Sequence, residues 1–305
     1  MGFAKPIEQY LFGNLLIEIQ VFMYLKDIIR GDTNMRRFYE GNDNKGYQEV
    51  VDKEAGLELI GFDLIRLEPG ENAVYESGEY EIGLVILQGT CSVKVDDVTF
   101  DKLGTRRSVF DGKPTTVYVP RDSKYEVTAT GSMMLEIGVC KVKARKKYEA
   151  FVIDANDVTT EHRGKLNWQR DVNDIITSKY EGKVDRIVLG ETYSMPGQWS
   201  SYPSHKHDTD NLPFEVNMEE IYHFKVNPSQ GFGIQVMYSD DMSLRESYII
   251  KNGDSVAIKN GYHPVAAAPG YQVYYLWVMA GADTRQLTPC DDPNHAWVKA
   301  VEKMV

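Results

Sequence analysis

The histidines of this chain gather in one stretch. The sequence has six, and four of them fall between positions 205 and 263. His205 and His207 are two residues apart in Ser-His-Lys-His-Asp, and side chains two apart on a β-strand point to the same face. Two imidazoles presented together in this way can bind one divalent metal ion.

A carboxylate and a further histidine follow at positions that complete a metal site. In Met-Glu-Glu-Ile-Tyr-His-Phe, alternation puts Glu220 on one face with Tyr222 and Phe224, an aromatic pair typical of a barrel lining. We therefore expect Glu220 to be the third ligand, and Glu219 would replace it if the facing of the strand is shifted by one residue. A glycine turn before His263 can return that imidazole to the same point.

Three neutral imidazoles and one carboxylate leave a divalent ion with net positive charge and open coordination positions. Such a centre is a Lewis acid. With no thiolate among these ligands, the set suits zinc, manganese, iron, cobalt or nickel, with zinc slightly favoured. Two histidines at this spacing also occur on ordinary surfaces, but the later glutamate and the Gly-Tyr-His turn favour a metal site. We expect His223 to be structural and His295 to lie in a terminal loop.

Short strands separated by turns are predicted along both halves of the chain. Between Leu57 and Val142, apolar runs recur about every ten residues with Gly, Pro and Asp between them, which is typical of an antiparallel sandwich or barrel. Strands resume at Arg186 and continue to Met279. Each half has a Pro-Gly turn followed by a glycine-rich turn before a closing strand, so we expect one barrel design used twice. The matching positions of the first half carry no histidine, so only the second barrel is expected to bind metal.

The composition excludes several classes of function. The chain has 305 residues and a net charge of -11, which provides no electrostatic footprint for nucleic acid and no basic patch for a membrane surface. The apolar run from Leu11 to Ile29 is interrupted by charged and amide residues, so we expect a packed helix there rather than a membrane span. Three widely spaced cysteines predict no disulfide framework and favour a reducing cytoplasm.

Four segments of the second half resemble those of a known family, the 5-deoxy-glucuronate isomerases of inositol catabolism. They read PGQWSSYPSHKHDTDNLP, EEIYHFKVNPSQGFGIQVMYSDD, NGDSVAIKNGYHPVAAAPGYQVYYLWVMAG and DDPNHAW. That family is similar to the 4-deoxy-L-threo-5-hexosulose-uronate ketol-isomerases of the pectin pathway. The order His-x-His, Glu, Gly-turn-His is also similar to the metal signature of the cupin superfamily of small β-barrels.

The resemblance implies an all-β bicupin fold and a metal-dependent aldose-ketose isomerase. The expected substrate is 5-deoxy-glucuronate and the expected product is 2-deoxy-5-keto-gluconate. By the pattern of the family, the metal ligands are His205, His207, Glu220 and His263. We expect a helical extension over residues 1–34, a first cupin barrel without metal over 35–160 and a second barrel with the metal site over 161–305.

An isomerase of this kind also needs a general base and a group that binds the carboxylate of the sugar acid. Glu191 and Tyr222 are our candidates for the base, and Gln235 is an amide that could orient a hydroxyl. The carboxylate ligand stays open among three arginines, which are Arg163, Arg170 and Arg186.

Three other functions are compatible with the same residues. Another uronate ketol-isomerase would keep the metal site and the reaction type with a different substrate. An iron-dependent dioxygenase would keep the metal site and change the chemistry, and a sugar-acid binding module would bind without turnover. Whatever the function, exposed sheet edges need covering, so we expect a homo-oligomer.

Overall fold

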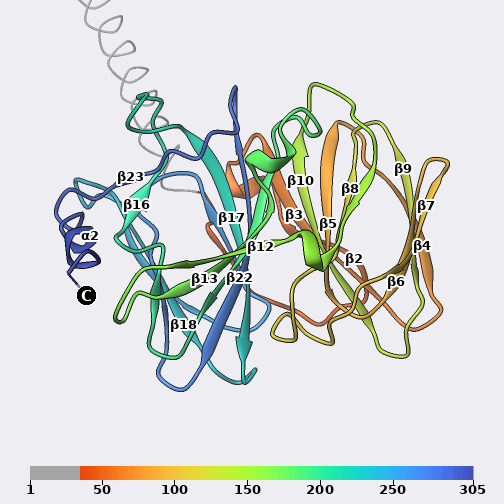
Figure 1. The fold of residues 1–305 in the computed structure, drawn as a ribbon, viewed down its shortest axis with the longest axis horizontal. Coiled ribbons are helices and arrows are strands. Elements are labelled where there is room, and N and C mark those ends of the chain that lie inside the picture. Colours follow the sequence, from red (N-terminus) through yellow and green to blue (C-terminus); the bar gives the residue numbers. More distant parts are fainter. Residues whose placement is uncertain (1–34, 305) are drawn as a thin grey trace, which may run out of the picture.

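The computed structural model describes residues 35–304, which are almost entirely β-structure. Two lobes lie side by side, each built from antiparallel strands (Figure 1). The all-β class predicted from the sequence is therefore confirmed. The helix predicted within residues 1–34 lies outside the described residues.

The first lobe contains two sheets that share one apolar core. The six-stranded sheet has the order β11-β8-β5-β10-β3-β2 and consists of β2 (Gly46–Val51), β3 (Ile60–Leu67), β5 (Tyr80–Gln88), β8 (Thr116–Val119), β10 (Leu135–Lys143) and β11 (Phe151–Ile153). The four-stranded sheet has the order β4-β9-β6-β7 and consists of β4 (Asn72–Glu76), β6 (Cys91–Val95), β7 (Val98–Leu103) and β9 (Lys124–Ala129). Ile65 and Ile137 of the larger sheet and Val93 and Val127 of the smaller one belong to the same buried cluster.

The second lobe contains three sheets. The seven-stranded sheet has the order β1-β20-β17-β22-β14-β13-β12 and consists of β1 (Phe38–Tyr39), β12 (Thr159–Arg163), β13 (Arg170–Ile176), β14 (Val188–Ser194), β17 (Met218–Asn227), β20 (Ser255–Ile258) and β22 (Gln272–Gly281). The four-stranded sheet, β15-β21-β18-β19, consists of β15 (Trp199–Ser200), β18 (Gly233–Tyr238), β19 (Arg245–Ile250) and β21 (Val265–Ala267). A two-stranded sheet pairs β16 (His205–Lys206) with β23 (Cys290–Asp291). Phe224 and Val273 of the large sheet pack with Met237 and Val265 of the four-stranded sheet in one core.

Helices are few and short in this part of the chain. They are η1 (Lys53–Ala55), η2 (Ala155–Asp157), η3 (Ser178–Tyr180) and α2 (Val298–Val301). Within residues 35–304, no helix is long and apolar enough to cross a membrane.

The two largest sheets pack against each other and join the lobes. Alternate side chains of these sheets face the junction, where Leu64 and Cys140 of the first lobe lie in one cluster with Ile221 and Leu276 of the second. Glu81 strengthens the junction because its carboxylate accepts backbone hydrogen bonds from residues 185–187, at 2.6–2.9 Å.

The first described strand belongs to the second lobe. Phe38 in β1 pairs with Val256 in β20, and only afterwards does the chain build the first lobe. The division into units at residues 34/35 and 160/161 therefore stays a prediction.

Candidate metal centre

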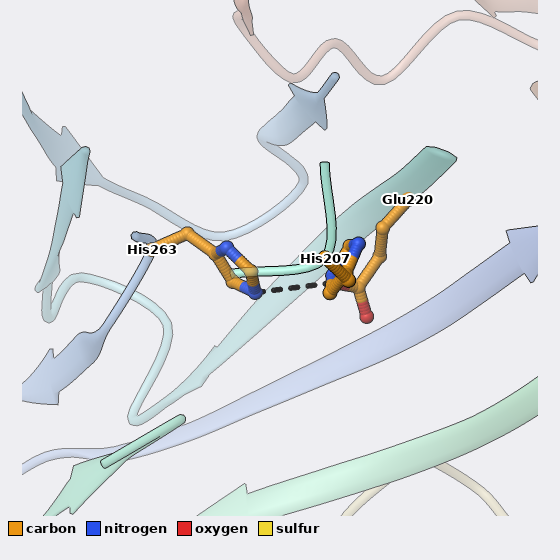
Figure 2. A group of neighbouring side chains, drawn as sticks. All are labelled: His207, Glu220 and His263. Carbon is orange, nitrogen blue, oxygen red and sulfur yellow. Dashed lines mark hydrogen bonds and ion pairs between the residues drawn. The ribbon is translucent and has the colours of Figure 1, made fainter. Parts of the chain in front are cut away.

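Three of the four predicted metal ligands meet inside the second lobe. Glu220 comes from β17, His207 directly follows the short strand β16, and His263 lies in the turn between β20 and β21. Their side chains point toward one another (Figure 2). One ligand atom from each lies within 4.8 Å of the other two, and all three residues are buried.

The hydrogen bonds fix which nitrogen of each histidine faces the glutamate. The Nδ1 atoms of His207 and His263 lie 2.7 Å and 2.9 Å from the backbone carbonyls of Met218 and Gly261. A carbonyl oxygen only accepts, so each Nδ1 carries a hydrogen, and in the neutral ring, the form that binds metal, each Nε2 presents its lone pair to the cluster.

This arrangement fits a divalent cation. Oε2 of Glu220 lies 3.1 Å from Nε2 of His207 and 3.3 Å from Nε2 of His263. At these distances the lone pairs of the two nitrogens repel the carboxylate oxygen unless a proton or a metal cation lies between them. Nε2 of His263 is also sealed from solvent without a hydrogen-bond partner among the described residues. A buried, unsatisfied imidazole nitrogen is costly to a protein unless a ligand completes it.

The electrostatics keep the carboxylate ionised. Burial alone would raise the pKa of Glu220, but His207 and His263 outweigh it in their protonated form, whose place a bound cation would take, and hold the pKa at about 2. The second oxygen of the carboxylate stays available to a ligand, and the net charge of the three residues with neutral imidazoles is -1.

The fourth predicted ligand, His205, lies beside this group but not within it. Its ring centroid is 5.0 Å from that of His263 and 6.4 Å from that of His207. Burial and the neighbouring imidazoles lower the pKa of His205 well below its usual value, so it is neutral near pH 7. A neutral imidazole is the form that binds metal.

The residues that the sequence assigned to the opposite face of β17 lie outside the cluster. Both oxygens of Glu219 accept backbone hydrogen bonds from Glu58 and Leu59, at 2.7 Å and 2.8 Å. His223 stacks on Phe62 at the junction between the lobes, with 4.8 Å between centroids. Glu220 therefore lies on the face of β17 that the sequence predicted.

A pocket of about 280 Å³ opens on the cluster. His207 and Glu220 line it together with His205 and Tyr222. The phenol of Tyr222 lies 3.0 Å from Oγ of Ser201. Burial, followed by the charge of Glu220, raises the pKa of Tyr222 well above its usual value, so this phenol can donate a proton but does not act as a phenolate base near pH 7.

The other two predicted catalytic residues do not line the pocket. Glu191 points from β14 toward the first lobe, where its carboxylate accepts from Arg106 Nη2 at 2.6 Å and from the Tyr274 hydroxyl at 2.7 Å. Those bonds and its position on the far face of the sheet do not fit the role of a base for substrate. Gln235 is fully buried, and its Nε2 donates to the carbonyl of His263 at 2.7 Å. It supports the turn that carries His263, one of the predicted ligands.

Family membership follows from comparison of the whole chain. Residues 35–298 match the model of the KduI/IolB family. The chain belongs to the KduI/IolB family. A relative from Geobacillus kaustophilus, named 5-deoxy-glucuronate isomerase, is 38% identical over 258 residues, which are 84% of this chain and 92% of the relative. The crystal structure of an IolB-like protein from Salmonella typhimurium LT2 is 37% identical, with a TM-score of 0.82 and coverage of 87% of this chain and 99% of that one.

A more distant likeness concerns the fold alone. A structure of a Bacillus subtilis oxalate decarboxylase, described for its Mn(II) centres, is 12% identical to this chain, with a TM-score of 0.55. The match covers 84% of this chain and 79% of the decarboxylase chain. This likeness agrees with the cupin fold predicted from the sequence.

Sequence reasoning missed a charged network behind the predicted metal ligands. Lys206 points away from the cluster and contacts Asp208 and, at 3.0 Å, both oxygens of Glu215. The second oxygen of Asp208 accepts from the backbone N–H of Gly261 at 2.8 Å, which ties the His207 segment to the turn that carries His263. The adjacency of Lys206 and Asp208 to the histidine pair was the only signal in the sequence.

Proposed function

We propose that this protein converts 5-deoxy-glucuronate to 2-deoxy-5-keto-gluconate in myo-inositol catabolism. Family membership supports this assignment, as does the name 5-deoxy-glucuronate isomerase of relatives that align over most of their length. The observation that carries it is the buried group of His207, Glu220 and His263 at a pocket large enough for part of a small sugar. The reaction moves a proton between C1 and C2 and shifts the carbonyl from the first carbon to the second.

We infer that the ligand set is the buried group together with His205, whose ring borders it. A bound divalent ion would polarise the substrate carbonyl and stabilise the negative charge that develops on its oxygen atoms. The donor set contains three imidazoles and a carboxylate, so zinc, manganese, iron, cobalt and nickel all suit it, and zinc is the first to test.

Of the three residues predicted to be catalytic, we propose a role in proton transfer for Tyr222. Its phenol is protonated near neutral pH and lines the pocket beside Glu220. It can donate to a substrate oxygen as that oxygen gains charge, and recover the proton later. Ser201 lies 3.0 Å from this phenol and 3.4 Å from the Tyr275 hydroxyl, so the three groups form a short hydrogen-bonded chain that holds the phenol in place.

Product analysis tests the proposal. Purified protein reconstituted with each of the five metals in turn is incubated with 5-deoxy-glucuronate in a sealed NMR tube, with dissolved oxygen recorded in parallel. We expect the aldehyde-hydrate signals to give way to those of the keto acid with no loss of oxygen. Oxygen consumption would instead indicate a dioxygenase, and saturable binding without product would indicate a binding module.

We also propose that copies of the chain associate and that the protein works in the cytoplasm. β19 forms an edge of its sheet, and Ile249 on it is exposed. An edge of this kind favours association. The three cysteines lie unpaired in the structure, as a reducing compartment requires. Light scattering tests the first part: a single species at 34.7 kDa would contradict it.

A further inference from the structure

We propose that Arg170 binds the carboxylate of the substrate and thereby selects sugar acids over neutral aldoses. The inference rests on the proposed isomerase function and names the group that recognises the end of the substrate remote from the reacting carbons. It also chooses among the three arginines that the sequence offered as ligands of the substrate carboxylate.

The guanidinium of Arg170 is held in place by backbone. Its Nη1 donates to the carbonyls of Trp168 at 3.2 Å and Tyr202 at 3.0 Å. Tyr202 lies in the segment that leads into His205, so these bonds fix the guanidinium relative to the metal ligands. Nε and Nη2 form no hydrogen bond with any residue of 35–304, and neither is sealed from solvent. Since Arg170 lines the pocket, two donors of its fork remain for a ligand.

The charge of Arg170 has no counterion among residues 35–304. No carboxylate of this range lies within 4.0 Å of its guanidinium. Two fully buried arginines differ: Arg106 pairs with Glu191 and Arg66 pairs with Glu136, at 2.6 Å and 2.7 Å.

Burial lowers the pKa of Arg170, yet a guanidinium stays protonated in proteins. A charge that is partly removed from water and has no counterion is unfavourable, and an anionic ligand reduces that penalty. Two parallel N–H groups match the two oxygens of a carboxylate.

The two other arginines fit this role less well. Arg163 also lines the pocket, but its guanidinium is paired with Glu161 at 2.6 Å and is half-exposed. Arg186 lines a different hollow and donates to the carbonyl of Lys143.

The wall beside Arg170 matches the proposed substrate. Val172 is two residues further along β13, on the same face, and lines the same pocket. In 5-deoxy-glucuronate the carbon next to the carboxylate is a methylene, which an apolar side chain accommodates without leaving a hydroxyl unpaired. Ser201 and Tyr222, which also line the pocket, lie close to each other, and Tyr222 is on the same face of β17 as Glu220.

The test uses two ligands that cannot isomerise, so that binding is measured apart from turnover. One is the reduced substrate, in which the aldehyde is an alcohol and the carboxylate is kept. The other is its neutral counterpart, in which the carboxylate is also an alcohol. Both are titrated by calorimetry into zinc-loaded wild type, Arg170→Gln, Arg170→Lys and the control Arg163→Gln, and bound zinc is quantified in each sample.

We expect Arg170→Gln to weaken binding of the acid about 10- to 100-fold, the range for loss of a charged hydrogen-bonded pair. Binding of the neutral ligand should change less than about threefold, and zinc content should be unchanged. Arg170→Lys should recover part of the loss because it keeps the charge without the fork. Arg163→Gln should weaken binding of the acid less than about threefold, because the charge of Arg163 is already paired with Glu161.

Equal weakening of both ligands by Arg170→Gln would overturn the proposal, because it would show a structural role. So would a loss for the acid with Arg163→Gln as large as with Arg170→Gln. A failure of the proposed function looks different: the wild type would bind the acid through Arg170 but form no keto acid from 5-deoxy-glucuronate.

Discussion

At the scale of single residues, the proposed metal site depends on two imidazole nitrogens that face one carboxylate oxygen. Alternation along β17 was enough to choose Glu220 over Glu219, because the aromatic neighbours of Glu220 marked the face that lines the lobe. The same reasoning placed His223 on the other face. It gave no information on Glu191, since the partner of that carboxylate, Arg106, comes from the other lobe and lies 85 residues earlier in the chain.

Replacement of His207 by alanine removes one wall of the cluster. We expect bound metal to fall from about one ion per chain to less than a tenth of an ion per chain. The variant keeps only Glu220, His263 and the neighbouring His205, and a site that has lost one ligand binds a metal ion far more weakly. Elemental analysis of purified protein measures this, with circular dichroism to verify the fold. His295→Ala, at a partly exposed site in the terminal segment, is the control. Undiminished metal in His207→Ala would show that the ion binds elsewhere.

The Tyr222→Phe substitution removes only a hydroxyl. If this phenol transfers a proton to substrate, kcat should fall about 10²-fold or more while bound metal stays constant. Steady-state kinetics with 5-deoxy-glucuronate provide the measurement. A change confined to KM would assign Tyr222 to binding instead.

At the scale of elements, the site depends on two short segments held together by charge. The sequence predicted a strand carrying both histidines, but the strand β16 covers only His205 and Lys206. His207 lies just past it, and its orientation comes from the bond to the Met218 carbonyl rather than from a strand. Periodicity could not indicate this, because one residue of irregular backbone redirects a side chain without changing the pattern of residue types.

The Asp208→Asn substitution weakens the tie between these segments. The amide keeps the size of the side chain but removes its charge toward Lys206, so the turn that carries His263 should be less firmly positioned. We expect metal affinity to fall about 10- to 100-fold, as is usual when a partner of a metal ligand is lost. Competition with a fluorescent chelator measures the affinity. Asp101→Asn, on an exposed position of β7, serves as the control, and equal affinities for the two variants would refute the positioning role.

At the scale of the whole molecule, two lobes are joined through buried charge as well as apolar packing. The similar order of turns in the two halves predicted the repetition of β-structure. The contribution of β1 to the second lobe was not predictable, since two residues carry no periodicity. Nor were the ion pairs across the junction, because each joins residues far apart in the sequence.

Glu136 makes one of these ion pairs sensitive to pH. It binds Arg66 at 2.7 Å and, across the lobes, Lys225 at 2.7 Å. Burial would raise the pKa of Glu136, but Lys225 and Arg66 outweigh burial and hold the pKa at about 2, below the value of 4.5 for a free glutamate. A lowered pKa means that the carboxylate stabilises the fold fully above about pH 5 and loses this effect as the pH falls toward 2.

The lowering of the Glu136 pKa from 4.5 to about 2 corresponds to about 3 kcal/mol of unfolding free energy. Urea unfolding at several pH values from 7 to 3, for the wild type and Glu136→Gln, tests it. The variant should be less stable at pH 7 and should lose stability less steeply on acidification. Parallel curves for the two proteins would show that Glu136 does not titrate in this range.

The most direct test of the central claim is the turnover of 5-deoxy-glucuronate by metal-free protein before and after metal is restored. Protein is stripped with a chelator, freed of chelator, confirmed metal-free by elemental analysis and then titrated with zinc or manganese. We predict negligible conversion without metal and recovery that saturates at one ion per chain, with no recovery in His207→Ala. Full conversion by protein shown to be metal-free would contradict the account.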